Sequence, residues 1–284
     1  MILLAGLLLA GNDSLKVKID ARVAQVPGAI VGISLRDLQT GDSLDINADD
    51  LFHAASTMKV PVMIELFRQT ERGALRMDQK ILLANEFKSI VDGSPFSVDA
   101  KDDSDSLVYT WIGQRVPIHD LLEHMIDRSS NLATNALIQL IDAKRANETA
   151  HMLGAKNIRV LRGVEDGKAF QAGMNNQTTS RDLAALLVAI ETNKAASKKS
   201  CDEMRQILLR QEFNDEIPAG LPAGTPVAHK TGSITAVRHD AAIVYPPNRK
   251  PYVLVILTRG IPDDKVASGM MADISRLVWQ SIMD

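Results

Sequence analysis

Alternating apolar and polar or small residues mark both ends of the chain as β-rich. The alternation predicts strands at residues 29–35, 43–46, 226–233, 241–245 and 252–258. A Thr-Gly-Asp turn at 40–42 joins the first two strands as a hairpin. Apolar residues at helical spacing predict a helix at 14–25 before the hairpin and another at 264–283 after the last strand. Each end of the chain therefore combines strands with a terminal helix.

The centre of the chain follows a helical period. Helices are predicted at 56–73, 118–126, 131–142 and 179–193, the last capped by Ser180. The run Lys-Asp-Asp-Ser-Asp-Ser at 101–106 is expected to be a solvated loop. The economical fold is of the α/β (α+β) class, with one antiparallel sheet built from both ends, flanked by the terminal helices, and an inserted all-helical domain. We place the sheet domain at 12–60 and 213–284 and the helical domain at 61–212.

Residues 1–11 form an uninterrupted apolar run. The run is too short to span a bilayer, but it has the length of the apolar core of a secretory signal peptide and ends in small residues. Since no Lys or Arg precedes it, the signal is atypical or begins further upstream; the alternative is a buried N-terminal helix or strand. We expect a signal-peptide remnant, and hence an exported protein, periplasmic or secreted.

Composition narrows the classes of partner. The chain has 284 residues, a formal net charge of −3 and 4% aromatic residues. It therefore offers neither a basic surface for nucleic acid or an anionic membrane nor stacking platforms for bases. The one cysteine, Cys201, is expected to be a partly buried structural thiol. No metal and no cofactor are expected, because no typical ligand spacing is found among His119, His124, His151, His229 and His239.

Ser56 and Lys59 form a first candidate chemical motif, S-x-x-K. Ser56 falls at a predicted helix start, where backbone N–H groups and the helix dipole favour an oxyanion. Lys59 projects from the same face one turn later. If its amine is desolvated, it is neutral and can accept the serine proton. Taken alone, the pair is more often a capping serine and a solvated lysine.

Two more motifs follow along the chain. Ser129-Ser130-Asn131 lies between two predicted helices, where capping serines are also common. Lys230-Thr231-Gly232-Ser233 lies in a predicted strand, and an ammonium, a hydroxyl and a glycine at a strand edge suit an anionic, extended substrate. Gly232 would let the substrate backbone approach closely. Each motif is weak when taken alone.

The motif order S-x-x-K, S-x-N, K-T-G, on a helix start, an inter-helix turn and a strand, resembles the class A serine β-lactamases of the β-lactamase and penicillin-binding protein superfamily. The resemblance covers nearly the whole chain from about residue 14, and Asn135 is similar to a structural asparagine of the family. It implies the serine β-lactamase / D,D-peptidase fold, with the site between a sheet domain and a helical domain.

The resemblance also implies catalytic roles. Ser56 would be the acylated nucleophile, Lys59 its partner base, and Ser129 the group that protonates the leaving nitrogen. Backbone N–H groups of Ser56 and Ser233 would form the oxyanion hole.

Substrate-binding roles are implied for residues of all the later motifs. Asn131 would hold the acyl-amide side chain of the substrate, and Lys230 and Thr231 would bind its carboxylate. Arg238 is a candidate second carboxylate anchor, or else a structural residue, and His239 competes for that position.

The chain departs from the family pattern in the loop around residues 162–171. The family places a glutamate there, which activates the water that hydrolyses the acyl-enzyme, usually as E-x-x-L-N. Glu165 is near the expected position, but Lys168-Ala169 replaces Leu-Asn and no Asp immediately precedes Thr178 to pair with Arg162. Glu165 is therefore either the deacylation base or an exposed charge in a turn, with Asp166 as an adjacent candidate. Ser130 also replaces the usual Asp of the middle motif.

Three functions remain open at this point. The first is a β-lactamase that opens the β-lactam ring through an acyl-enzyme on Ser56. The second is a D,D-peptidase or penicillin-binding enzyme that acts on peptidoglycan stem peptides. The third is a non-catalytic β-lactam or cell-wall sensor, which would not need the full set of motif residues. A small-molecule β-lactam or a peptidoglycan peptide is the expected partner, and we expect a monomer.

Overall fold

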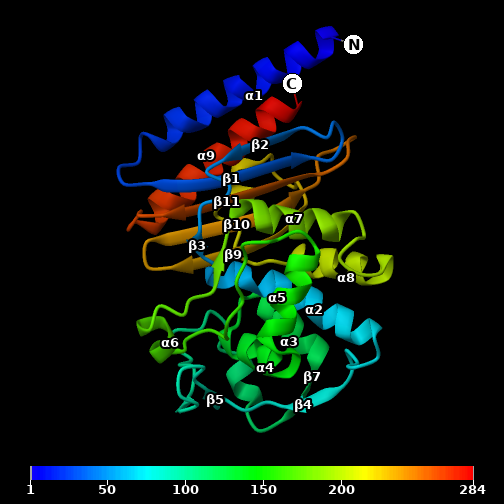
Figure 1. Ribbon diagram of the computed structural model, residues 1–284, viewed down its shortest axis with the longest axis vertical. Coiled ribbons are helices and arrows are strands. Elements are labelled where there is room, and N and C mark those ends of the chain that lie inside the picture. The colour runs from blue at the N-terminus through cyan, green and yellow to red at the C-terminus, as the bar shows by residue number, and fades with distance from the viewer. Residues whose placement is uncertain (1, 284) are drawn as a thin grey trace.

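The main sheet is antiparallel and combines strands from both ends of the chain. The structure, a computed structural model, describes residues 2–283, and the side chains of residues 13–283. Within that range the sheet has five strands in the order β2-β1-β11-β10-β9. Their bounds are β1 (Ile30–Asp37), β2 (Ser43–Ile46), β9 (Val227–Ile234), β10 (Val237–Val244) and β11 (Tyr252–Arg259). The predicted fold class, an antiparallel sheet flanked by terminal helices, is confirmed (Figure 1).

Both faces of the sheet are covered, and the central strand β11 is accordingly apolar from Tyr252 to Leu257. Its alternate side chains face different clusters: Val255 and Leu257 join the cluster of the central helices, whereas Leu254 and Ile256 join that of the terminal helices. The terminal helices α1 (Ile2–Val23) and α9 (Asp264–Met283) pack together on the outer face, and α7 (Ser180–Glu191) packs on the inner face (Figure 1). The edge strand β9 lies beside the helical part of the molecule, where it contacts α8 (Lys198–Leu208) and the turn at 55–58.

The helical part surrounds α2 (Lys59–Glu71), which is buried along most of its length. Around it lie α3 (Ile118–Asp127), α4 (Asn131–Ile141), α5 (Ala143–Met152) and α8 (Lys198–Leu208). The shorter elements are β3 (Phe52–His53), η1 (Ala55–Met58), β4 (Lys80–Leu82), β5 (Phe87–Lys88), β6 (Pro95–Phe96), η2 (Val108–Trp111), β7 (Arg115–Pro117), α6 (Gly167–Gln171), β8 (Gln177–Thr178) and η3 (Pro218–Gly220).

Three local predictions were wrong. The first helix begins at Ile2 rather than at residue 14, because the Leu- and Ala-rich run continues it without a break; residue 1 lies outside the described range. Thr179, not Ser180, caps α7, because its side chain accepts a hydrogen bond from the Asp182 amide. The loop at 101–106 is not fully solvated, since Asp103 and Asp105 are buried.

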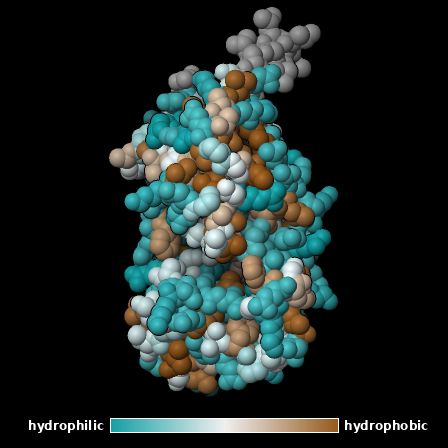
Figure 2. Space-filling model, turned by 90° about the vertical axis from the view of Figure 1, so that its left-hand side faces the viewer, coloured by the Kyte–Doolittle hydropathy of each residue, from teal (hydrophilic) through white to brown (hydrophobic). Residues whose placement is uncertain are grey.

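Hydrophilic residues cover most of the face of the molecule on which α6 lies, with apolar residues interspersed among them (Figure 2). Among the described residues, no helix is both long enough and apolar enough to cross a membrane.

Candidate active site

Ser56 lies in a single 3₁₀ turn, η1, immediately before α2. The residue before it, Ala55, has a left-handed φ of 44°, which is unfavourable for a residue with a Cβ. The His53 ring compensates in part, because its Nδ1 accepts a hydrogen bond from the Ala55 amide at 3.0 Å. This strained turn places Ser56 at the N-terminal end of a buried helix, where an oxyanion is favoured.

The edge strand β9 runs against this turn at Gly232. A Cβ added to Gly232 would lie 2.9 Å from the Ser56 amide nitrogen and 3.1 Å from that of Thr57. We expected this glycine to admit the substrate backbone; the structure shows that the protein's own nucleophile turn already requires it. The close approach sets the next residue, Ser233, beside Ser56, and both line one cleft.

Lys59 is fully buried and points into the turn between α3 and α4. Its Nζ donates to the Ser129 carbonyl at 2.6 Å, to Ser129 Oγ at 3.0 Å and to Asn131 Oδ1 at 3.1 Å. Burial, together with the nearby Lys230 charge, lowers the pKa of Lys59 well below its ordinary value. A neutral amine can therefore exist here and accept a proton.

Lys230 approaches the same serine from β9. Its Nζ donates to Ser129 Oγ at 3.0 Å and to the Thr231 carbonyl at 3.0 Å. Burial lowers the pKa of Lys230 to about 7. Ser129 Oγ thus lies between two buried amines, those of Lys59 and Lys230. This geometry allows a proton to move between Ser129 and either amine.

A cleft of about 750 Å³ collects most of the predicted motif residues. Its lining includes Ser56, Ser129, Asn131, Thr231, Gly232, Ser233 and Arg238. An adjoining hollow shares Ser56 and Asn131 and adds the loop after residue 161, including Glu165. Ser56 therefore lies where the two hollows meet.

Arg238 lies directly across from Ser233 in the β9–β10 register. Its guanidinium lines the cleft, but it is already paired with Glu216 at 2.7 Å and lies 3.4 Å from Asp264. His239 does not compete for this position. It is buried beneath the strand and within hydrogen-bond distance of the His53 carbonyl at 2.8 Å, and burial lowers its pKa to about 4.

In the loop after residue 161, Arg162 is held by amide groups rather than by an ion pair. Arg162 donates to the Met174 carbonyl at 2.9 Å and to Asn175 Oδ1 at 3.2 Å, which agrees with the prediction that this chain lacks the Arg–Asp pair of the family. The side-chain amide of Asn135 in α4 bonds both the N–H and the carbonyl of Val164, at 2.7 and 3.0 Å. Asn135 thereby fixes the residue next to Glu165.

Glu165 faces the site, not bulk solvent alone. It has a left-handed φ of 62°, and its Oε1 accepts a hydrogen bond from Asn131 Nδ2 at 2.6 Å. Desolvation in the hollow raises the pKa of its carboxyl group, although Glu165 is exposed.

Asp166, the adjacent candidate, is wrong as a base. It is buried, and its carboxylate accepts hydrogen bonds from Ser89 Oγ, the Ile90 amide and the Ala169 amide. It holds the loop in place.

Comparison with known proteins agrees with this arrangement. Residues 14–282 match the model described as "Beta-lactamase enzyme family". The chain belongs to the beta-lactamase enzyme family. It is 24% identical to the beta-lactamase VEB-1 of Pseudomonas aeruginosa, over 95% of this chain and 91% of the relative.

Two solved structures are similar to this chain over nearly its whole length. A structure of PBP-A superposes with a TM-score of 0.82 and 28% identity, over 95% of this chain and 96% of the other. A beta-lactamase from Sphaerobacter thermophilus superposes with a TM-score of 0.81 and 27% identity, over 94% and 97%. A mutant of PBP-A is known as an acyl-enzyme complex with penicillin G.

Sequence reasoning missed Asp103, which lies at the start of α4. Its carboxylate accepts hydrogen bonds from the amides of Asn131 and Leu132 at 2.8 and 3.0 Å. The signal available in the sequence was indirect: Ser130 replaces the Asp that the family carries in its middle motif, so a carboxylate was missing there.

In the part of the chain that the structure describes, no group of three or more His, Cys, Asp or Glu side chains could hold a metal ion. Cys201 is free and buried in α8.

Proposed function

We propose that this protein is a serine hydrolase that opens the β-lactam ring of penicillins or cephalosporins through an acyl-enzyme on Ser56. The observation that carries the proposal is the line of buried groups from Lys59 through Ser129 to Lys230. Ser129 lines the same cleft as Ser56, and the edge strand β9 runs against the Ser56 turn at Gly232. Family membership and the β-lactamases among the relatives support the same chemistry.

In the proposed acylation, Ser56 Oγ attacks the β-lactam carbonyl and its proton passes to neutral Lys59. The amides of Ser56 and Ser233 would stabilise the negative oxygen, which is usually a large part of such catalysis. Ser129 then protonates the leaving nitrogen and is itself resupplied by the neighbouring amines. Intact-protein mass spectrometry after mixing with a penicillin tests this step, since the adduct has the mass of the whole antibiotic.

The proposal assigns Lys230 to the carboxylate of the substrate. Lys230→Ala should lower the second-order acylation rate by roughly 10- to 1000-fold, because a buried charge pair is lost. Since the protonated form binds the anion, acylation should also fall as pH rises above about 7, the value to which burial lowers the pKa of Lys230. The methyl ester of the same penicillin is the control: the variant should affect it far less. Equal losses for ester and acid would contradict the assignment.

A second candidate function is that of a D,D-peptidase, which is acylated but deacylates slowly towards penicillins. The specific observation in its favour is the loop of Glu165, whose carboxylate is held by Asn131 on a differently built loop. The likeness to PBP-A, a protein whose mutant is known as a penicillin G acyl-enzyme, supports the same alternative.

Glu165→Gln separates the two candidates. If Glu165 holds the hydrolytic water, wild type turns over a chromogenic cephalosporin and the variant accumulates acyl-enzyme, with deacylation slowed by about 10²- to 10⁴-fold. Glu86→Gln, at an exposed carboxylate that lines neither hollow, is the control and should turn over normally. A wild-type adduct that persists for hours, unchanged in Glu165→Gln, would instead assign the protein to the D,D-peptidases.

We also propose that the protein is exported and contributes to β-lactam resistance outside the cytoplasm. The apolar run at residues 1–11 and the location of peptidoglycan substrates support this. Cell fractionation of the native host, with the full gene intact, is the test.

A further inference from the structure

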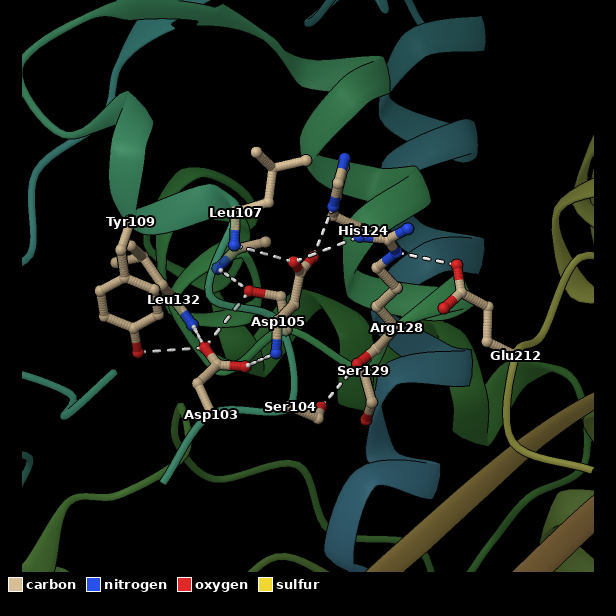
Figure 3. A network of polar contacts seen from close by, with 12 residues as sticks. Asp103, Ser104, Asp105, Leu107, Tyr109, His124, Arg128, Ser129, Leu132 and Glu212 are labelled. Atoms are coloured by element: carbon tan, nitrogen blue, oxygen red, sulfur yellow. Dashed lines mark hydrogen bonds and ion pairs between the residues drawn. The ribbon is translucent and has the colours of Figure 1, made fainter. Parts of the chain in front are cut away.

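The acidic segment 101–106 is docked on the turn between α3 and α4 (Figure 3). Ser104 Oγ donates to the Arg128 carbonyl at 2.6 Å, at the end of α3. The Asp105 carboxylate lies 2.5 Å from His124 Nδ1, in α3 itself. Asp103 and Asp105 are 9% and 2% exposed, so these two side chains are packed against the protein, whereas the other four residues of the segment are exposed.

Asp103 caps the first turn of α4 from this separate segment. Besides the amides of Asn131 and Leu132, its Oδ2 accepts hydrogen bonds from Tyr109 Oη at 3.0 Å and Ser130 Oγ at 3.3 Å. The first N–H groups of a helix have no partner within the helix, and a carboxylate there is favoured by the helix dipole. Asp103 thus supplies the charge that the middle motif of this chain lacks.

Ser129 is held on both sides by consecutive residues of the segment. Its φ of 60° is left-handed and needs support from its surroundings. Ser104 fixes the carbonyl of Arg128, just before Ser129. Asp103 accepts hydrogen bonds from the hydroxyl of Ser130, just after it, and from the amide of Asn131. The hydrogen-bond partners of the Lys59 amine belong to this same turn, so its geometry decides where that amine lies.

We propose that Asp103 is a positioning residue for acylation, which holds the Ser129–Asn131 turn in place and faces Lys59 with a negative charge. The proposal rests on the proposed acylation of Ser56. It is distinct from the roles of the motif residues, because Asp103 does not line the cleft. Its hydrogen bonds are with the start of α4, with Tyr109 and with the amide of Asp105.

The charge of Asp103 makes the proposal testable by pH. Three charged groups face Lys59: Lys230 from β9, which lowers its pKa below the value that burial sets, and Asp103 and Glu165, which raise it. Removing the charge of Asp103 therefore lowers the pKa of Lys59 further. Because the neutral amine accepts the proton, the acid limb of the acylation rate should move to lower pH.

The experiment compares Asp103→Asn, which keeps the shape but not the charge, with Asp103→Ala, which removes both. Asp105→Asn is the matched control, since it removes a buried carboxylate of the same segment that does not contact α4. Acylation by a penicillin is followed from about pH 5 to about pH 9, a range in which groups with a lowered lysine pKa titrate. Asp103→Ala should acylate on the order of tenfold more slowly, and Asp103→Asn should shift the acid limb to lower pH. Asp105→Asn should keep the wild-type limb.

Hydrogen exchange at the Asn131 and Leu132 amides gives a second measurement that needs no activity. These amides should exchange faster in Asp103→Ala than in wild type or Asp105→Asn. The proposal would be overturned if both Asp103 variants kept the wild-type acylation rate, the wild-type acid limb and the wild-type amide exchange. It would also be overturned if Asp105→Asn shifted the acid limb as much as Asp103→Asn does. If Asp103→Ala does not fold, the position of the acid limb in Asp103→Asn decides whether the proposal holds. If wild type forms no adduct, the proposed function fails, and the exchange comparison alone decides the role of Asp103.

Discussion

Replacing Ser56 with Ala is expected to abolish the covalent adduct that penicillins form with this protein. The hydroxyl of Ser56 is the group that would carry the acyl chain, and an alanine at this position offers no nucleophile. Turnover should fall by about 10⁴-fold or more, since the remaining groups can only bind and polarise the substrate. Intact-protein mass spectrometry, with wild type measured in parallel, gives the result directly.

The Ser56→Ala protein should remain folded, which makes the result interpretable. Residue 56 lies at the surface of the cleft, and the strained turn around it is held by the backbone and by His53. Loss of one hydroxyl there creates little empty volume. The thermal unfolding temperature should therefore match that of wild type. An adduct that still forms at the wild-type rate would place the nucleophile elsewhere, and peptide mapping would locate it.

The sheet could be predicted from the sequence because its strands alternate or are flanked by clear turns. The predicted 252–258 and the observed Tyr252–Arg259 differ by one residue, and α9 matches its predicted bounds. Such elements bury one defined face or both, so the local pattern carries the information. The motifs were recognised from their order along the chain and from the resemblance to the class A serine β-lactamases, since each is weak when taken alone.

The parts that could not be predicted depend on contacts between distant segments. Asp103 contacts the amide of Asn131 across 28 positions of sequence, and an acidic run looks solvated until its partners are known. The same holds for His239, whose burial depends on the carbonyl of His53 on another strand. Glu165 could be located in sequence but not oriented, because its orientation depends on Asn131 and on the bonds from Asn135 to Val164.

Gly232 was correctly predicted to matter, but for a different reason from the one that the structure shows. Gly232 was singled out as a place for the substrate, whereas the backbone of the nucleophile turn already occupies the space that a side chain would need. Any substitution there is expected to displace Ser56 before it affects a ligand. The sequence shows only that a glycine is needed at position 232. The distances to the Ser56 and Thr57 amides show that the nucleophile turn needs it.

Replacing Lys59 with Met is the second change with a large expected effect. Methionine has a similar length and keeps the packing of α2, but it removes the amine that would accept the Ser56 proton. Acylation should slow by about 10²- to 10⁴-fold, the usual contribution of a positioned proton acceptor. The acid limb of the pH profile should disappear with it, because that limb reports the loss of a proton from Lys59.

The stability of Lys59→Met should not fall with its acylation rate, and this difference separates a catalytic role of Lys59 from a structural one. Lys59 is 0% exposed, and its amine is costly to bury even with partners from Ser129 and Asn131. We therefore expect Lys59→Met to unfold at the same temperature as wild type or at a higher one, while acylation is lost. A variant that acylates within about tenfold of wild type would exclude Lys59 as the base. Glu165, whose carboxylate shares Asn131 with Lys59, would then be the next group to test, as Glu165→Gln in the Lys59→Met background.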